Sequence, residues 1–279
     1  MIGSDAKPDY KNNMLQEIGM TVVDVWMAAL PRRHPSPDEL SKCKIVSHRG
    51  EHDNRSVREN TMLAFETAQS AGVWGIETDI RWTSDMVPVI HHDSDTRRVF
   101  GNSISIADTR FEELRKAVPE IPTLGELVKK FGGTIHMMLE LKAEPFPQLE
   151  RQRSILEEHL ADLRAIDDYH ILALDTELFE DFDIQPRKCC LSVAGTNFGP
   201  LSQTTLKSDY GGLTGHFLLL NNRLKKQHEQ SGQVIGTGFI RSRNCLIREI
   251  NRGVEWIFTN DAVRLQNALN KLLEGSSKN

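Results

Sequence analysis

The stretch Gly75-Ile76-Glu77-Thr78-Asp79-Ile80 carries two carboxylates within a run of small, apolar and β-branched residues. Such a run is typical of a β-strand, and because side chains alternate between the two faces of a strand, Glu77 and Asp79 point to the same face. Two like charges side by side need a cation near them, or one of them must take up a proton. The stretch therefore predicts a strand that carries a chemical site.

Short β-type runs alternate with helical patterns on both sides of that stretch. Eight runs are predicted to be barrel strands: Lys44–His48, Trp74–Trp82, Thr134–Lys142, His170–Leu174, Lys188–Val193, Gly215–Leu220, Gln233–Gly238 and Glu255–Thr259. The clearest helical patterns are Thr61–Ala71, Pro122–Lys130, Pro147–Leu163, Arg223–Gln230 and Arg243–Asn251. Strands that alternate with helices indicate βαβ units and a parallel sheet. The sequence therefore predicts an α/β fold, a (β/α)₈ TIM barrel, and the lack of a GxGxxG motif after the first strand disfavours an open doubly wound sheet.

Two local features complete this prediction. The run Val87–His91 is interpreted as a ribbon in the loop region after the second strand, and an irregular segment follows it to Pro119. Asn60 is expected to cap the helix that begins at Thr61.

One domain is expected, because a barrel of this kind occupies about 250 residues and the chain has 279. The barrel domain is predicted at residues 41–274, after an N-terminal helical extension at residues 1–40. In the extension, apolar residues from Met14 to Leu30 follow a helical period, but Gln16, Glu17 and Asp24 make that helix too polar to span a bilayer. It is expected to pack on the barrel or on a second subunit of a homo-oligomer, with attachment to a membrane surface as the alternative.

Composition narrows the partners and the compartment. The formal net charge is −5, and Lys and Arg form no basic stripe, so nucleic acid is not an expected partner. The cysteines show no CxxC spacing and are interpreted as buried, reduced thiols: Cys43, Cys189, Cys190 and Cys245. Together with the lack of a clean secretory signal, these thiols favour a cytoplasmic location.

A third carboxylate lies in the next predicted strand, where Glu140 and Lys142 repeat the two-residue spacing with opposite signs. Barrels place their active sites at the C-terminal ends of the strands, so Glu77, Asp79 and Glu140 are expected to converge there. Such an oxygen-rich site suits Mg²⁺ or Ca²⁺. A structural ion-pair network around Lys142 is the alternative.

Histidines also follow predicted strands. His48 ends the first strand beside Arg49, and His91 and His92 follow the ribbon, just before Asp93. Hydrolysis of a phosphodiester needs a base for the nucleophile, an acid for the leaving alkoxide, and positive charge on the non-bridging oxygens. All of these groups are present at the expected site.

The same residues belong to motifs that recur in order along the chain. The motifs are His48–Gly50, Glu59–Thr61, Glu77–Asp79, Thr83–Asp93, Ile121–Leu124, Leu139–Lys142 and Ile257–Asn260. As an ordered set they resemble the glycerophosphodiester phosphodiesterase family, from about Val46 to Asn260. The resemblance is specific for the family and not for the substrate.

The resemblance implies a role for each matching residue. The matches are His48 and His92 for the acid–base pair, Glu77, Asp79 and Glu140 for the metal ligands, Arg49 and Lys142 for the groups that bind phosphate, and Glu59 and Asn60 for supporting residues. His91 occupies the variable position beside His92 and, facing the opposite way in a strand, is expected to be structural.

Three departures from the family pattern bear on the substrate. The loop Glu51–Arg58 is about two residues longer than expected, and its side chains are expected to reshape one wall of the site. The seventh strand, Val234–Phe239, lacks the tryptophan common in relatives, which puts the pocket for the alcohol in doubt. The N-terminal extension to about Leu40 has no counterpart in the minimal pattern.

The function that follows is metal-dependent hydrolysis of a small-molecule glycerophosphodiester to glycerol 3-phosphate and an alcohol. Its elements are acid–base catalysis by the histidines and a divalent metal held by the carboxylates. A lysophospholipase D-type phosphodiesterase is the first alternative, and a barrel that binds phosphodiesters without turnover is the second. The alcohol, the choice of metal, the assignment of acid and base, and attack by water or by the substrate's 2-hydroxyl stay open.

Overall fold

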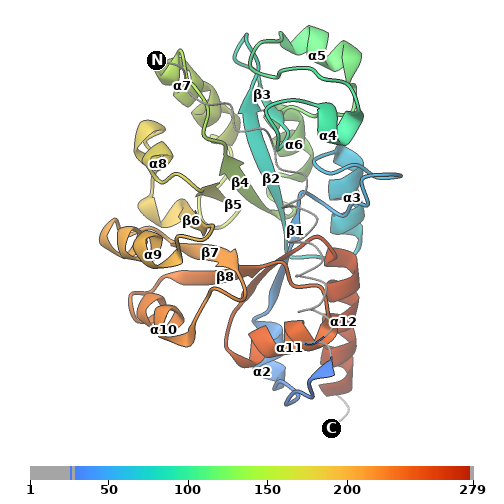
Figure 1. The fold of residues 1–279 in the computed structure, drawn as a ribbon, viewed down its shortest axis with the longest axis vertical. Helices are drawn as coiled ribbons and strands as arrows, with labels where there is room; N and C mark the ends of the chain where they lie inside the picture. The colour runs from blue at the N-terminus through green and yellow to red at the C-terminus, as the bar shows by residue number, and fades with distance from the viewer. Residues whose placement is uncertain (1–25, 27–28, 277–279) are drawn as a thin grey trace.

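The computed structural model describes residue 26 and residues 29–276, which form a closed barrel of parallel strands surrounded by helices (Figure 1). The barrel strands are β1 (Lys44–His48), β2 (Gly75–Trp82), β4 (His136–Leu141), β5 (Tyr169–Ala173), β6 (Cys190–Ala194), β7 (Gly212–His216), β8 (Val234–Gly238) and β9 (Trp256–Thr259). Each is parallel to the next in chain order, and the pairing of β9 with β1 closes the barrel. The (β/α)₈ TIM-barrel prediction is confirmed.

The helices follow the strands and cover the outside of the barrel (Figure 1). Those on the barrel wall are α3 (Met62–Ser70), α6 (Leu124–Phe131), α7 (Leu149–Leu160), α8 (Glu177–Asp181), α9 (Phe198–Lys207), α10 (Asn222–Gln230), α11 (Arg243–Asn251) and α12 (Ala262–Ser276). The short α2 (Pro37–Ser41) packs against α12, and its Leu40 is fully buried in the main core. Nearly all of the predicted helix from Met14 to Leu30 lies outside the described residues, and the predicted boundary near residue 40 stays a prediction.

Three local predictions were wrong. The strand expected at Gly215–Leu220 is β7, which begins three residues earlier, because Gly211 and Gly212 let the chain pass close to its neighbours: a Cβ on Gly212 would lie 2.1 Å from the Val234 carbonyl oxygen. The strand expected from Lys188 begins at Cys190, after the 3₁₀ turn η1 (Arg187–Cys189).

The third concerns the segment to Pro119, which is not irregular throughout. The ribbon expected at Val87–His91 is confirmed as the strand β3 (Pro88–Ile90), paired antiparallel with β2, but the segment after it contains the helices α4 (Arg97–Phe100) and α5 (Phe111–Ala117). A small apolar cluster of its own, which includes Val89, Leu114 and Ile121, holds this excursion together.

Side chains alternate across the barrel wall, as the period of a strand requires. In β2, Ile76 and Ile80 join the apolar layer between sheet and helices, whereas Glu77 and Asp79 face the interior. The interior below them is filled by a separate apolar cluster: Val46, Met138, Leu172, Leu191, Trp256 and Phe258. The barrel is therefore packed, and only its C-terminal end is polar.

Histidines and tryptophans fill the opposite, N-terminal end of the barrel. The His136 ring stacks on Trp74 at 4.2 Å, and His136 Nε2 lies 2.8 Å from His170 Nδ1. The ammonium of Lys44 lies over the Trp74 ring, 4.8 Å from its centroid. Burial lowers the pKa of His136 to about 4, and burial together with His136 lowers the pKa of His170 to about 3.

Two further observations bear on the sequence predictions. All four cysteines are free thiols, three of them buried and Cys43 half-buried. Among the helices that the structure describes, none combines the length and the apolar character needed to cross a bilayer.

The histidine pair predicts acid sensitivity. Because the folded protein binds protons on these rings less readily than the unfolded chain, whose histidines titrate near 6.5, the free energy of unfolding is expected to fall as pH drops from 6.5 toward 4. The loss should approach ~1 kcal/mol per pH unit for each ring. Urea unfolding between pH 7 and pH 4.5 measures it.

The matched comparison is His170→Asn, which should flatten this pH dependence, against His34→Asn at an exposed position, which should not. Equal slopes in the wild-type protein and His170→Asn would contradict the assignment to the buried pair.

Candidate active site

The site begins at the end of β1, where the backbone turns sharply. Arg49 and Gly50 both adopt left-handed conformations, with φ of 59° and 76°. A side chain on Gly50 would place its Cβ 2.8 Å from the Ala64 backbone, so glycine is required there both by the backbone angle and by the contact. The Arg49 N–H donates to the Glu77 carbonyl oxygen at 2.9 Å, which fixes the start of this turn against β2.

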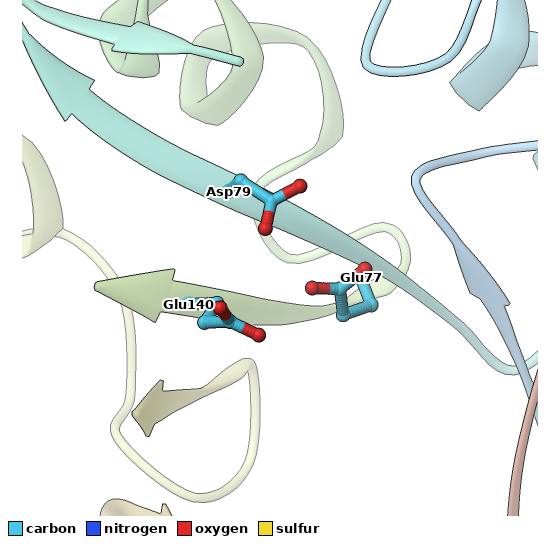
Figure 2. Close-up of side chains that lie close together, drawn as sticks. All are labelled: Glu77, Asp79 and Glu140. Atoms are coloured by element: carbon cyan, nitrogen blue, oxygen red, sulfur yellow. The ribbon is translucent and has the colours of Figure 1, made fainter. Parts of the chain in front are cut away.

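Three carboxylates converge at the C-terminal end of the barrel. In the register of the sheet Asp79 lies opposite Glu140, and His48 lies opposite Glu77. Figure 2 shows Glu77 and Asp79 on β2 and Glu140 on β4, and one oxygen from each lies within 4.8 Å of the others. The three residues are 2%, 1% and 7% exposed, so their charges are largely removed from water.

Two cations face this cluster. Lys142 Nζ lies 2.8 Å from Asp79 Oδ1 and 2.5 Å from Glu140 Oε1, and Arg49 Nε lies 3.3 Å from Asp79 Oδ2. Although burial opposes it, these two cations hold the pKa of Asp79 well below its usual range. Burial and the neighbouring Asp79 carboxylate raise the pKa of both Glu77 and Glu140.

The donor set fits a divalent cation. Glu77 Oε1 is buried and has no hydrogen-bond partner among the described residues, so one carboxylate oxygen faces the cluster without compensation. Three carboxylates with only two nearby cations leave negative charge in a buried site, and carboxylate oxygen is the ligand that Mg²⁺ and Ca²⁺ prefer. Glu77, Asp79 and Glu140 could therefore hold such an ion.

Asn60 does not cap the helix that follows it, contrary to the sequence prediction. Thr61 is the N-cap of α3, its side chain accepting from the Ala64 N–H. Asn60 has a left-handed backbone (φ 57°), and its amide nitrogen donates to Asp79 Oδ2 at 2.8 Å while its oxygen accepts from Thr78 Oγ1. It therefore fixes the orientation of Asp79.

Glu59 holds two arginines, Arg49 and Arg98, beside the carboxylate cluster. It accepts from Arg49 at 2.9 Å and from both terminal nitrogens of Arg98 at 2.6 and 2.8 Å. Arg98 Nε in turn donates to Asp93 at 2.6 Å. One guanidinium thus links the turn after β1 to the segment that carries His92.

The two candidate histidines are each oriented by a neighbour. His48 Nδ1 lies 2.6 Å from the side-chain oxygen of Asn260, and its Nε2 lies 3.7 Å from Glu77. Burial and the charge of Arg49 lower the pKa of His48 to about 3. His92 Nδ1 lies 2.7 Å from Asp93 Oδ1. His91 is buried away from the cluster, where its Nε2 contacts the Asp95 carbonyl oxygen at 3.0 Å.

Three supporting residues were not assigned roles from the sequence. Asn260 and Asp93 stand inside motifs that were recognised, so their positions next to strand ends were a usable signal. No such signal marks Arg98 in the sequence. Its partner Glu59 lies 39 residues away along the chain, and no sequence motif links Arg98 to Glu59 or Asp93.

The longer loop Glu51–Arg58 is folded largely on itself. The Asp53 carboxylate accepts the backbone N–H groups of residues 55, 56 and 57. Asn54 Nδ2 donates to Glu59 Oε2, whereas Arg58 pairs with Glu120 and with the Val99 carbonyl oxygen. The loop thus acts on the site through Glu59, and Arg58 is engaged elsewhere.

A pocket of about 110 Å³ opens beside the cluster. It is lined by His48, Glu77, Glu140, Leu172, Val193, Ala194, Thr214, Gly215, Gly238, Phe239, Phe258 and Asn260. Among these described residues, the ones that β5 to β9 and their loops contribute are all uncharged. One side of the pocket is therefore lined by ionisable side chains, and the other side is mainly apolar.

Comparison with known proteins identifies relatives of this site and fold. Residues 48–187 match the model of the glycerophosphoryl diester phosphodiesterase family. Glycerophosphodiester phosphodiesterase 1 of Rattus norvegicus is 38% identical over 101 residues, 31% of this chain and 30% of that protein. A glycerophosphodiester phosphodiesterase of Caldanaerobacter subterraneus is 33% identical over 114 residues, 37% of this chain and 46% of that protein. These matches thus span less than half the length of the curated relatives.

Solved structures show the same fold over most of the chain. A glycerophosphodiester phosphodiesterase from Thermotoga maritima has a TM-score of 0.69 at 21% identity and covers 81% of this chain and 97% of its own. A phosphodiesterase from Oleispira antarctica, in complex with the product sn-glycerol-3-phosphate, has a TM-score of 0.68 at 20% identity and covers 81% of this chain and 96% of its own.

The carboxylate cluster predicts metal binding that calorimetry can measure. Mg²⁺ or Ca²⁺ is expected to bind the chelator-stripped protein, and Glu140→Gln should weaken the binding at least ~10-fold, because the site loses a charged ligand. Glu144→Gln is the matched control, since Glu144 is a half-buried carboxylate that pairs with Arg81 outside the cluster. Equal affinities of the two variants would contradict this site.

Proposed function

The chain belongs to the glycerophosphoryl diester phosphodiesterase family, and we propose that it hydrolyses glycerophosphodiesters to glycerol 3-phosphate and an alcohol. The observation that carries this proposal is the carboxylate cluster at the barrel mouth, faced by two cations and flanked by two oriented histidines. The Oleispira antarctica phosphodiesterase, solved with sn-glycerol-3-phosphate as its product, supports the same product here.

We assign Glu77, Asp79 and Glu140 as the ligands of a divalent cation, Mg²⁺ or Ca²⁺. When bound, such an ion would supply positive charge to the phosphate oxygens and lower the pKa of the nucleophile. Arg49 and Lys142, whose nitrogens face the same cluster, would bind the non-bridging phosphate oxygens. Asn60 and Glu59 would keep Asp79 and Arg49 in place.

The hydrogen bonds of the two histidines suit different roles. Because the Asn260 oxygen can only accept, His48 carries its proton on Nδ1 and keeps a lone pair on Nε2, the state that a base needs. The Asp93 carboxylate beside His92 Nδ1 would balance the charge of a protonated ring, the state that an acid needs. We therefore assign His48 to accept the proton of the nucleophile, water or the substrate's 2-hydroxyl. His92 would give a proton to the alcohol oxygen as its bond to phosphorus breaks.

A second candidate, a lysophospholipase D-type activity, is favoured by one observation. The pocket wall away from the cluster is formed by apolar side chains, among them Leu172, Val193 and Phe258. Such a wall suits the acyl chain that a lysophospholipid carries on its glycerol better than it suits a charged head group. The free thiols support the expected cytoplasmic location for either activity.

Turnover tests the proposed function directly. The chelator-stripped protein, supplied with Mg²⁺ or Ca²⁺, is expected to release glycerol 3-phosphate from glycerophosphocholine and glycerophosphoethanolamine, and to release none without a cation. Lysophosphatidylcholine, assayed by choline release, is the comparison substrate. A higher kcat/KM for the lysophospholipid would establish the second candidate instead. No hydrolysis of any substrate with either cation would leave a barrel that only binds phosphodiesters.

Substitutions test the roles of the two histidines. His48→Ala and His92→Ala should each lower kcat at least ~100-fold, because each removes one proton transfer. A p-nitrophenyl ester of glycerol phosphate, whose leaving group needs no proton, should restore most of the rate of His92→Ala and little of that of His48→Ala. His91→Gln, at the buried neighbour, is the control and should stay near the wild-type rate. Rescue of both variants or of neither would overturn the assignment of acid and base.

A further inference from the structure

Three large apolar side chains are exposed together beside the barrel mouth. Leu218, Leu219 and Phe239, here called the apolar rim, are 43%, 44% and 51% exposed. His216 joins them, because its ring stacks on Phe239 at 5.3 Å between centroids and its Nδ1 accepts the Leu218 N–H. Clustered apolar side chains on a surface, unlike scattered ones, mark a site of interaction.

The backbone of Phe239 is held in an uncommon conformation. Its φ is 68°, a left-handed value that a bulky residue rarely adopts, and its N–H donates to the Phe258 carbonyl oxygen at 3.1 Å. The Phe239 ring is thus exposed on a backbone whose conformation is uncommon for a bulky residue. Strain of this kind is concentrated at functional positions.

An arginine-lined pocket of about 670 Å³ adjoins the rim, and Leu218 belongs to both. This arginine pocket is lined by Arg32, Arg33, Arg248 and Arg252, with asparagines between them. Among the residues that the structure describes, two acids pair with these arginines: the buried Glu249 pairs with Arg248 and Arg252, and Glu39 pairs with Arg33. Three paired arginines with two carboxylates leave one positive charge in excess among these described residues.

The sequence around this surface has the same bias. Between residues 211 and 254 the chain has seven Arg and Lys but only two Glu, although the whole chain has a net charge of −5. Local positive charge can draw a molecule of negative net charge toward an anionic surface.

From this juxtaposition we infer that the apolar rim and the arginine pocket dock the protein on an anionic phospholipid bilayer. The leucines and Phe239 enter the acyl–headgroup boundary, and the arginines bind lipid phosphates. Docking of this kind holds the barrel mouth against the membrane, because Phe239 also lines the pocket beside His48. The inference does not depend on the proposed hydrolysis, since it concerns binding alone.

The experiment is cosedimentation of the full chain with vesicles of phosphatidylcholine alone or of phosphatidylcholine mixed with phosphatidylserine. The protein is expected to bind the mixed vesicles and to be released by high salt. The double variant Leu218→Ser/Leu219→Ser should weaken binding at least ~10-fold, and its control is Leu63→Ser, at a leucine of α3 that is 53% exposed.

Charge is tested separately. Arg32→Gln/Arg33→Gln should weaken binding to the mixed vesicles and reduce its salt dependence. Arg164→Gln/Arg187→Gln, at surface arginines that also pair with acids, should not. Thermal melts establish that each variant is folded.

Several results would overturn the inference. One is absent binding to the mixed vesicles, and another is binding that Leu218→Ser/Leu219→Ser leaves unchanged. Loss of binding only on deletion of residues 1–25 would assign the membrane contact to that segment. A wild-type dimer that the leucine variant converts to a monomer, without vesicle binding by either, would identify the rim as a subunit interface.

Discussion

Three carboxylates buried within one end of a barrel form the constraint around which this structure is arranged. Removing like charges from water is unfavourable unless opposite charge and hydrogen bonds accompany them. Lys142 and Arg49 provide the charge, and Asn60 provides a hydrogen bond to Asp79. The remaining negative charge is why we propose that the cluster holds a cation and is not a structural ion-pair network alone.

The register of the parallel strands brings the carboxylates and a histidine together. Because β2 pairs with β4, Asp79 and Glu140 face each other, and because β1 pairs with β2, His48 lies next to Glu77. Two loops outside the barrel complete the arrangement. Arg98, on the segment after β3, binds Glu59 and Asp93 together and so ties the wall that holds Arg49 to the wall that holds His92.

Much of this arrangement could be predicted from the sequence because it depends on strand periodicity. The alternation in Gly75–Ile80 and Leu139–Lys142 determines which side chains share a face, and the strand ends determine where they meet. Asn60 was misread as a helix cap, because a cap and a carboxylate-binding amide look alike in sequence and only the left-handed backbone separates them. The start of β7 was missed because a pair of glycines resembles a turn, whereas here it allows close strand contact.

The packed N-terminal end of the barrel bears on how the molecule exchanges ligands. Trp74, His136 and Trp256 fill that end, and Trp256 continues into the apolar cluster that fills the interior, so the described side chains leave no passage along the barrel axis. A ligand must therefore leave through the same opening by which it entered. For a reaction that splits one molecule into two, the product bound deeper departs second, and while it stays it blocks the next substrate. Under the proposed function, a product that stays bound in this opening would therefore compete with the substrate.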